Sequence, residues 1–224
     1  MNAAAASAGF PGVRHPLADS FFSFCLLPTL SLHPSQAVAL VPDAVLQHAA
    51  ILPTTHRHWS EYLIQALELG VVSNLDDPAL PLAMLPQASL DKFMLSAGAV
   101  LAGKHIRRCI SRAEVQALQD QLGDSLYQFV CQRAARLHSG LESGVAWPVD
   151  DIIEELAALG SALLGLAFQE VAPAIGQRGL LRLPLETKNR MADLPLSSGE
   201  ALQISLSLLQ EIDPKWLSLF PAAH

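Results

Sequence analysis

The sequence predicts an all-α protein, a compact irregular helical bundle preceded by a proline-rich N-terminal region of short helices. Hydrophobic residues make up 51% of the 224 residues, while aromatic residues make up only 6%. The apolar content is therefore mostly Leu, Ala, Val and Ile. Leu and Ala favour helix, whereas a strand-built core normally uses more β-branched and aromatic side chains. Apolar residues also recur three and four positions apart, as they do on one face of a helix.

The N-terminal part divides into an arm and a region of short helices. Residues 1–20 are rich in Ala, Ser and Gly and have little to bury, so we expect a mobile N-terminal arm. Prolines recur throughout residues 21–86, and because each one disrupts a helix interior, only short helices fit between them. The predicted helices are Pro34–Leu40, Pro42–Ala50 and about Thr55–Leu69 with Gly70 at its end, and residues 74–87 are predicted to be a loop.

Residues 87–224 form the predicted main α-helical domain. Ser111 and Glu114 have the S-x-x-E spacing of a capping box, in which the hydroxyl and the carboxylate each accept a backbone N–H, and Ser197 and Glu200 repeat it. Asp213-Pro214 begins a short final helix, with Asp as the cap and Pro at the first helical position. The other predicted helices are Ser89–Leu101, Ser111 to about Leu122, a further one after Gly123, and the longest from Asp150 or Asp151 to Val171, closed by Pro173.

Small residues follow one face of the predicted helix that ends at Val171. Ala157, Ser161 and Gly165 lie four positions apart, and such a stripe lets a neighbouring backbone approach closely. We expect the core to form around this stripe.

Composition excludes several classes of function. The net charge of -7 argues against nucleic-acid binding, which needs a concentrated excess of Lys and Arg. Cys25, Cys109 and Cys131 are odd in number and lack CxxC spacing, which indicates a reducing, cytoplasmic environment. The scattered histidines predict no metal site, and no cofactor is expected. The longest apolar run, Leu156 to Phe168, is shorter than the ~20 residues that cross a bilayer, so no membrane insertion is expected.

Two short motifs imitate enzyme signatures. Gly98 to Lys104 nearly matches the phosphate-loop pattern G-x-x-x-x-G-K-[ST], but His105 replaces the hydroxyl residue, and the segment has the pattern of a helix. Gly123-Asp124-Ser125-Leu126 spells the signature of GDSL esterases and lipases, but no D-x-x-H follows, and a serine without a positioned base is not activated. The chain is therefore not predicted to be an enzyme, although nucleotide binding through Gly98–Lys104 stays open as an alternative.

Two groups of residues are candidates for binding a partner protein. The dense basic cluster consists of Lys104, Arg107, Arg108 and Arg112, together with His105. It is either a docking patch for an acidic partner, where charge would steer the encounter, or the solvated end of a helix whose carbonyls the cations complement. Trp216, in the short final helix, is the second candidate.

Two stretches of the sequence carry a recognisable pattern. One begins at Leu95, runs through Gly103-Lys-His-Ile-Arg-Arg-Cys-Ile-Ser-Arg112 and continues to Leu126-Tyr-Gln-Phe129. The other is the ending Leu208-Leu-Gln-Glu-Ile-Asp-Pro-Lys-Trp216, followed by Leu219-Phe220. Together they resemble the K-subunit family of bacterial type III secretion systems, called SctK and including YscK- and PscK-like proteins.

The resemblance implies a non-enzymatic cytoplasmic adaptor of the injectisome sorting platform, with no catalytic residues. Members link the cytoplasmic domain of the inner-membrane ring protein SctD to the SctQ pod, which leads to SctL and SctN. The expected location is thus the cytoplasm, peripheral to the inner membrane through the secretion apparatus. A type III secretion chaperone stays open as a further alternative, although such chaperones are usually smaller and mixed α/β.

Overall fold

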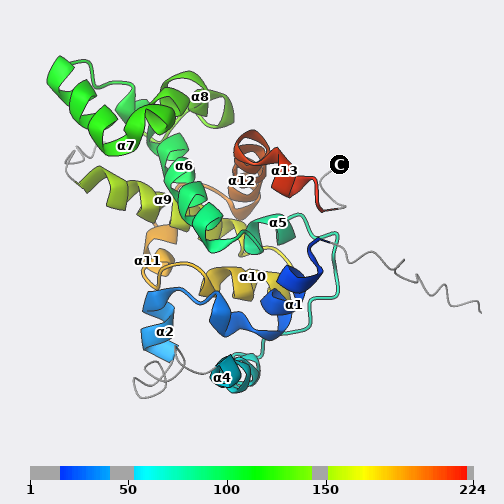
Figure 1. Cartoon of the computed structure of the whole chain (residues 1–224). Helices are drawn as coiled ribbons and strands as arrows, with labels where there is room; N and C mark the ends of the chain where they lie inside the picture. Colours follow the sequence, from blue (N-terminus) through cyan, green and yellow to red (C-terminus); the bar gives the residue numbers. More distant parts are fainter. Residues whose placement is uncertain (1–15, 41–52, 143–150, 221–224) are drawn as a thin grey trace, which may run out of the picture.

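The computed structural model describes residues 16–40, 53–142 and 151–220, and it contains helices but no strand within these ranges (Figure 1). The predicted all-α class is confirmed. Residues 1–15 of the predicted arm and the predicted helix Pro42–Ala50 lie outside the described residues. The elements are α1 (Ala18–Leu26), the 3-10 helix η1 (Pro28–Leu30), α2 (Pro34–Leu40), α4 (Pro53–Ala66), α5 (Leu80–Ala83), α6 (Gln87–Ile106), α7 (Arg112–Gln132), α8 (Ala134–Leu137), α9 (Ile152–Ala167), α10 (Pro173–Leu181), α11 (Thr187–Met191), α12 (Ser198–Ile212) and α13 (Pro214–Leu217).

Helices α6 and α9 cross at the centre of the molecule, and glycines make the crossing close (Figure 1). A Cβ atom on Gly98 would lie 1.9 Å from the backbone oxygen of Leu156, and one on Gly160 would lie 1.8 Å from that of Met94. Either distance is far inside van der Waals contact, so only glycine permits this approach. The predicted close packing of α9 is therefore present, but Gly160 is the residue at the crossing, while Gly165 of the predicted stripe packs against α11 through Met191.

Apolar side chains gather in two clusters on either side of this crossing. The larger cluster includes Phe24 of α1, Phe93 of α6 and Leu208 of α12. Residues of the predicted N-terminal region, 21–86, therefore pack in one core with residues of the predicted main domain, 87–224. The smaller cluster lies between the C-terminal half of α6, α7 and the N-terminal half of α9, and includes Leu118 and Val130.

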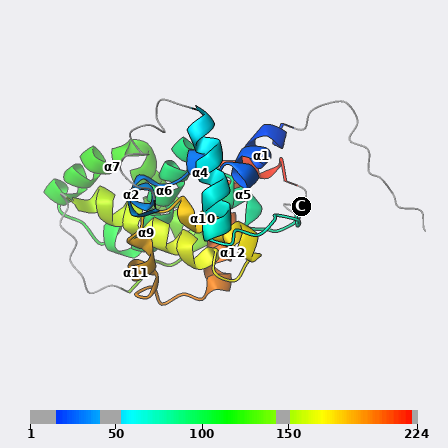
Figure 2. The same cartoon turned by 90° about the horizontal axis from the view of Figure 1, so that it is seen from below.

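Helices α1, η1 and α4 form a layer on the side of α10 that faces away from α6 and α9, and we call it the N-terminal layer (Figure 1). Seen from below, α4 lies on the outer side of this layer, against η1 and α1 (Figure 2). Thr29 of η1 and Ser60 of α4 place their hydroxyl oxygens 2.7 Å apart, and Ser60 is fully buried. Hydrogen bonds from Thr29 to Ser60 and to the His56 carbonyl oxygen therefore join η1 to α4.

Arg178 of α10 and Arg182, the C-cap of this helix, are both buried, and they attach α1, the segment after α4 and the α5 segment to α10. Arg178 donates hydrogen bonds to the carbonyl oxygens of Gly70 at 2.8 Å, Cys25 at 3.1 Å and Ala174 at 2.8 Å. Arg182, one helical turn later, donates to the carbonyl oxygens of Ala83 and Leu85. Both arginines are almost fully buried, at 4% and 5% exposure, and backbone oxygens are their hydrogen-bond acceptors among the described residues. A guanidinium can satisfy several carbonyls at once because it holds five N–H donors in one plane.

Helix α4 ends differently from the prediction. Glu68, with a φ of 49°, takes the left-handed position in place of Gly70. The Leu69 amide donates to the Ile64 carbonyl at 2.9 Å, and the Glu68 amide donates to the Gln65 carbonyl at 3.2 Å. These two bonds are those of a Schellman motif, which ends the helix at Ala66.

The predicted loop over residues 74–87 was wrong in part, because it contains helix α5. All four residues of α5 are buried against the core, and Pro81 stands in its first turn, where a missing N–H is tolerated. Asp77 fixes this segment: one carboxylate oxygen accepts from the Ala79 amide at 2.9 Å, and the other accepts from the Ala172 amide at 3.3 Å.

Helix lengths differ from prediction around the core. Helix α6 continues past its predicted end at Leu101 and ends at Ile106. Helix α9 was predicted to be the longest helix and to end at Val171, but it ends at Ala167 and is shorter than α6 and α7. The chain turns at Phe168 because α10 packs back on it: a Cβ on Gly179 would lie 2.7 Å from the Phe168 ring. Pro173 therefore begins α10 rather than simply closing α9, and α11 was not predicted.

Candidate partner-binding surface

The basic cluster lies where α6 ends and α7 begins. Lys104 occupies the last turn of α6, and the chain leaves the helix at Arg107. Ser111 then starts α7 with the predicted capping box, which is confirmed: its hydroxyl accepts from the Glu114 amide at 3.2 Å, and the Glu114 carboxylate accepts from the Ser111 amide at 3.3 Å. The cap fixes the direction in which α7 leaves the turn, and so places Arg112 at its first position.

Two of the four basic residues have partners inside the molecule. Lys104 forms an ion pair with Glu142, and this hydrogen bond and charge lower the pKa of the Glu142 carboxyl. Arg107 donates to the carbonyl oxygens of Val130 at 3.2 Å and Ser139 at 3.1 Å. These contacts connect the end of α6 to the segments before and after α8, so Lys104 and Arg107 stabilise the fold.

The other two basic residues face solvent. Arg108 and Arg112 are exposed and make no ion pair or hydrogen bond with any residue that the structure describes. Between them, Ile110 is 89% exposed, an unusual position for a large apolar side chain. We call Arg108, Ile110 and Arg112 the α6–α7 turn surface. The two arginines were predicted from the sequence and Ile110 was not, although its place between two cations was an available signal.

Trp216 lies apart from this surface. Helix α13 packs beside α12 and α5, away from α7 (Figure 1). The indole Nε1 donates to the Pro81 carbonyl oxygen at 2.9 Å, and the ring stands edge-on to Phe220 with centroids 5.4 Å apart. The Asp213 carboxylate caps this helix as predicted, accepting from the Trp216 amide at 3.0 Å. Trp216 is thus half-buried and anchors α13 on α5.

Both imitations of enzyme signatures take non-catalytic forms. Gly98 to Lys104 is continuous α-helix, so its backbone amides serve the helix ladder and form no loop around a phosphate. Gly123, with φ 74° and ψ 156°, breaks α7 as predicted, and Ser125 is exposed at the start of the following helical turn. In the GDSL family the nucleophile follows a strand, whereas this serine follows the first helical turns of α7.

Metal-ligand groupings and membrane-spanning helices are both absent from the part of the chain that the structure describes. Within residues 16–40, 53–142 and 151–220, no three His, Cys, Asp or Glu side chains are grouped as metal ligands would be. In the same ranges, none of the helices combines the length and the apolar character that crossing a bilayer requires.

Comparison with known proteins agrees with the resemblance seen in the sequence. A family model described as YOP proteins translocation protein K (YscK) matches residues 20–220. The fold is also that of a solved structure described as the cytoplasmic domain of the T3SS sorting platform protein PscK from P. aeruginosa. The TM-score is 0.53 at 20% sequence identity, over 87% of this chain and 94% of that one. No curated protein matches the chain. Because the family model covers most of its length, the chain belongs to the YscK family.

Proposed function

We propose that this protein is a non-enzymatic adaptor of a type III secretion sorting platform. In this role it links the cytoplasmic domain of an SctD-like ring protein to an SctQ-like pod protein, in the cytoplasm next to the inner membrane. Family membership over residues 20–220 is the observation that carries the proposal. The fold shared with the cytoplasmic domain of a sorting platform protein supports it.

The α6–α7 turn surface is the first partner contact that we propose. Arg108 and Arg112 place two positive charges around the exposed Ile110, in a chain whose net charge is -7. An apolar side chain between cations matches a partner surface with an apolar pocket rimmed by acids. Arginine is also enriched in protein interfaces, and exposed charges chiefly set the rate and the specificity of encounter.

The N-terminal layer, within the proposed N-terminal region 21–86, is the second contact. Its outer surface exposes large apolar side chains, among them Phe22 at 60% and Leu26 at 59%. An adaptor needs two separate surfaces to hold two partners, and this layer and the α6–α7 turn lie at different ends of the molecule (Figure 1).

Co-purification tests this assignment. The wild-type chain should retain SctQ and the SctD cytoplasmic domain, and an Arg108→Glu/Arg112→Glu variant should lose one of them. A Lys92→Glu/Lys188→Glu variant is the matched control, since it changes the charge equally at two exposed lysines on α6 and α11. Retention of neither subunit by the wild-type chain would refute the adaptor function. Equal retention by both variants would refute only the role of the α6–α7 turn surface.

A further inference from the structure

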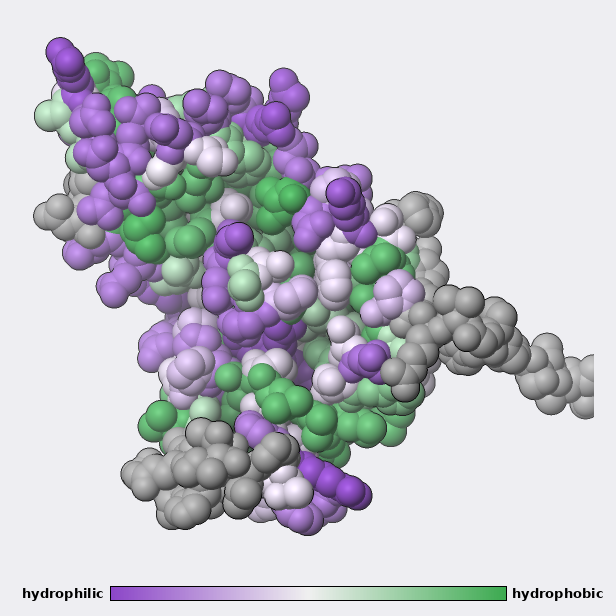
Figure 3. All heavy atoms as spheres, in the orientation of Figure 1, coloured by the Kyte–Doolittle hydropathy of each residue, from purple (hydrophilic) through white to green (hydrophobic). Residues whose placement is uncertain are grey.

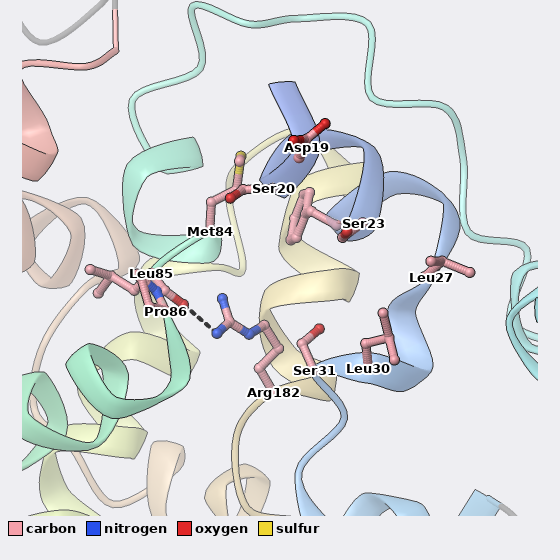
Figure 4. A pocket seen from close by; sticks show the side chains of 11 residues that line it. Asp19, Ser20, Ser23, Leu27, Leu30, Ser31, Met84, Leu85, Pro86 and Arg182 are labelled. Atoms are coloured by element: carbon pink, nitrogen blue, oxygen red, sulfur yellow. Dashed lines mark hydrogen bonds between the residues drawn. The ribbon is translucent and has the colours of Figure 1, made fainter. Parts of the chain in front are cut away.

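A cavity of about 250 Å³ opens in the N-terminal layer, between α1, η1 and the segment that follows α5 (Figure 4). Ser20 and Ser23 of α1 form one side, Leu30 and Ser31 another, and Pro86 lies opposite. Arg182, the C-cap of α10, lies at the inner end of the cavity, with the guanidinium directed toward the space between these walls.

Arg182 is a buried cation whose hydrogen-bond partners are neutral. Its two terminal nitrogens donate to the carbonyl oxygens of Ala83 and Leu85, and its Nε has no partner among the described residues. Burial lowers the pKa of Arg182 to about 10, and Asp91 is the acid whose charge opposes this shift. The guanidinium therefore remains charged at neutral pH, inside the protein and without a hydrogen-bonded carboxylate. A buried cation in this state favours an anion placed next to it.

Exposed apolar side chains lie beside the cavity: Leu30 is part of its lining, while Phe22 and Leu26 lie outside the lining, on a neighbouring face of α1. Leu26 and Leu30 are 59% and 55% exposed, and Phe22 on the same helix as Leu26 is 60% exposed. The space-filling view shows an apolar band over α1 and η1 (Figure 3). Phe22 and Leu26 are four positions apart and so lie on the same face of α1. A ligand for this cavity would therefore carry an acidic group next to apolar ones.

We propose that the cavity at Arg182 binds an acidic side chain, Glu or Asp, from an apolar segment of a partner protein. The carboxylate would enter between Ser23 and Pro86 and pair with the guanidinium, while neighbouring leucine-like side chains would cover Leu26 and Leu30. Arginine suits this role because its planar fork matches a carboxylate. Asp19 also lines the mouth, but it is exposed on α1, where water and salt weaken its repulsion, whereas Arg182 acts from the interior.

This site deepens the proposed function by giving the N-terminal layer a defined ligand chemistry. Its test does not depend on the identity of the partner, because the probe contains no secretion subunit. The probe is an array of twelve-residue peptides, each with a single central Glu between leucine-rich flanks, paired with the same peptides carrying Gln. The full-length chain is applied to both sets, and bound protein is quantified.

Variants at the cavity mouth make the test specific. Ser23 is half-buried and lines the cavity, so Ser23→Glu supplies a resident carboxylate that competes for Arg182, while Ser23→Gln adds similar bulk without charge. We expect the wild-type chain to bind the Glu peptides about tenfold more strongly than the Gln peptides. Ser23→Glu should abolish this preference, and Ser23→Gln should keep it.

Two results would overturn the proposal. One is equal binding of Glu and Gln peptides by the wild-type chain. The other is an unchanged Glu preference in Ser23→Glu, which would place the acid-binding group elsewhere. Thermal unfolding of both Ser23 variants is measured alongside, so that a loss of binding can be distinguished from a loss of structure. Co-purification of SctQ and SctD can succeed or fail independently of either result.

Discussion

Gly98 of α6 and Gly160 of α9 face opposite helices at one crossing, and each leaves room only for the backbone of its neighbour. The two helices therefore touch main chain to main chain at the centre of the fold. Both apolar clusters draw residues from this pair of helices, on either side of the contact. The crossing thus sets where the N-terminal layer and the α6–α7 turn can lie.

Gly160→Ala should destabilise the protein by about 3 kcal/mol, the upper end of the range for overpacking, because the added carbon would meet the Met94 carbonyl. Urea unfolding followed by circular dichroism measures the change. Gly199→Ala is the control, since nothing lies within 4 Å of its Cβ position in the first turn of α12. Equal stability of the two variants would show that α6 and α9 do not approach this closely.

Gly123→Ala should lower the free energy of unfolding by about 1–3 kcal/mol, because of backbone strain rather than overpacking. Nothing lies within 4 Å of the new carbon, but the backbone at φ 74° and ψ 156° is open essentially to glycine alone. The penalty would be one of backbone strain without a steric clash. The same unfolding measurement applies, and a stability gain would mean that α7 continues straight through this residue.

Arg178→Met should lower the free energy of unfolding by about 1–3 kcal/mol, because the carbonyls of Gly70 and Cys25 would lose a buried donor. The loss should appear first in the N-terminal layer, as faster amide exchange in α1. Arg190→Met is the comparison: its pair with Glu155 is exposed, and such pairs contribute about 0–1 kcal/mol. An equal effect of the two substitutions would argue against Arg178 as the attachment point.

Stability should fall as the pH drops below about 6.5, in part through His33. Burial lowers the pKa of His33, and its Nδ1 accepts from the Ser35 amide at 3.2 Å, a bond that protonation removes. The unfolded histidine, with a pKa of about 6.5, takes up a proton more readily than the folded one. The contribution is therefore present above pH 6.5 and is lost as the pH falls through the pKa of the folded state.

His33→Gln should flatten this dependence. The comparison is the unfolding free energy of the wild-type chain and the variant at pH 7.5 and pH 5.0. The difference between the two pH values should be smaller in the variant. An identical pH dependence would show that His33 does not resist protonation in the folded protein.

Local signals in the sequence predicted the helix ends well where a side chain makes the cap. The boxes at Ser111 and Ser197 and the cap at Asp213 all form, because each needs only residues within one helical turn. The break at Gly123 forms for the same reason. Helix α2 also has its predicted bounds, set by the proline that begins it.

Features that depend on distant neighbours escaped prediction. The left-handed residue that ends α4 is Glu68 rather than Gly70. Helix α10 contains Gly176 and Gly179, which lower helix propensity but are required because this helix packs on Phe168. Nothing local distinguishes a buried arginine from an exposed one, so Arg178 and Arg182 were not singled out. Arg107 belongs to the predicted binding cluster, and its hydrogen bonds to two carbonyl oxygens inside the fold were likewise not predicted.

In the adaptor function that we propose, this chain joins two proteins through separate surfaces of a helical body. The most direct measurement mixes the purified chain with SctQ and the SctD cytoplasmic domain and determines the mass of the complexes by size-exclusion chromatography with light scattering. The adaptor account predicts a complex of all three that does not form without this chain. Association of SctQ with SctD in its absence, or competition between them for the chain, would contradict the account.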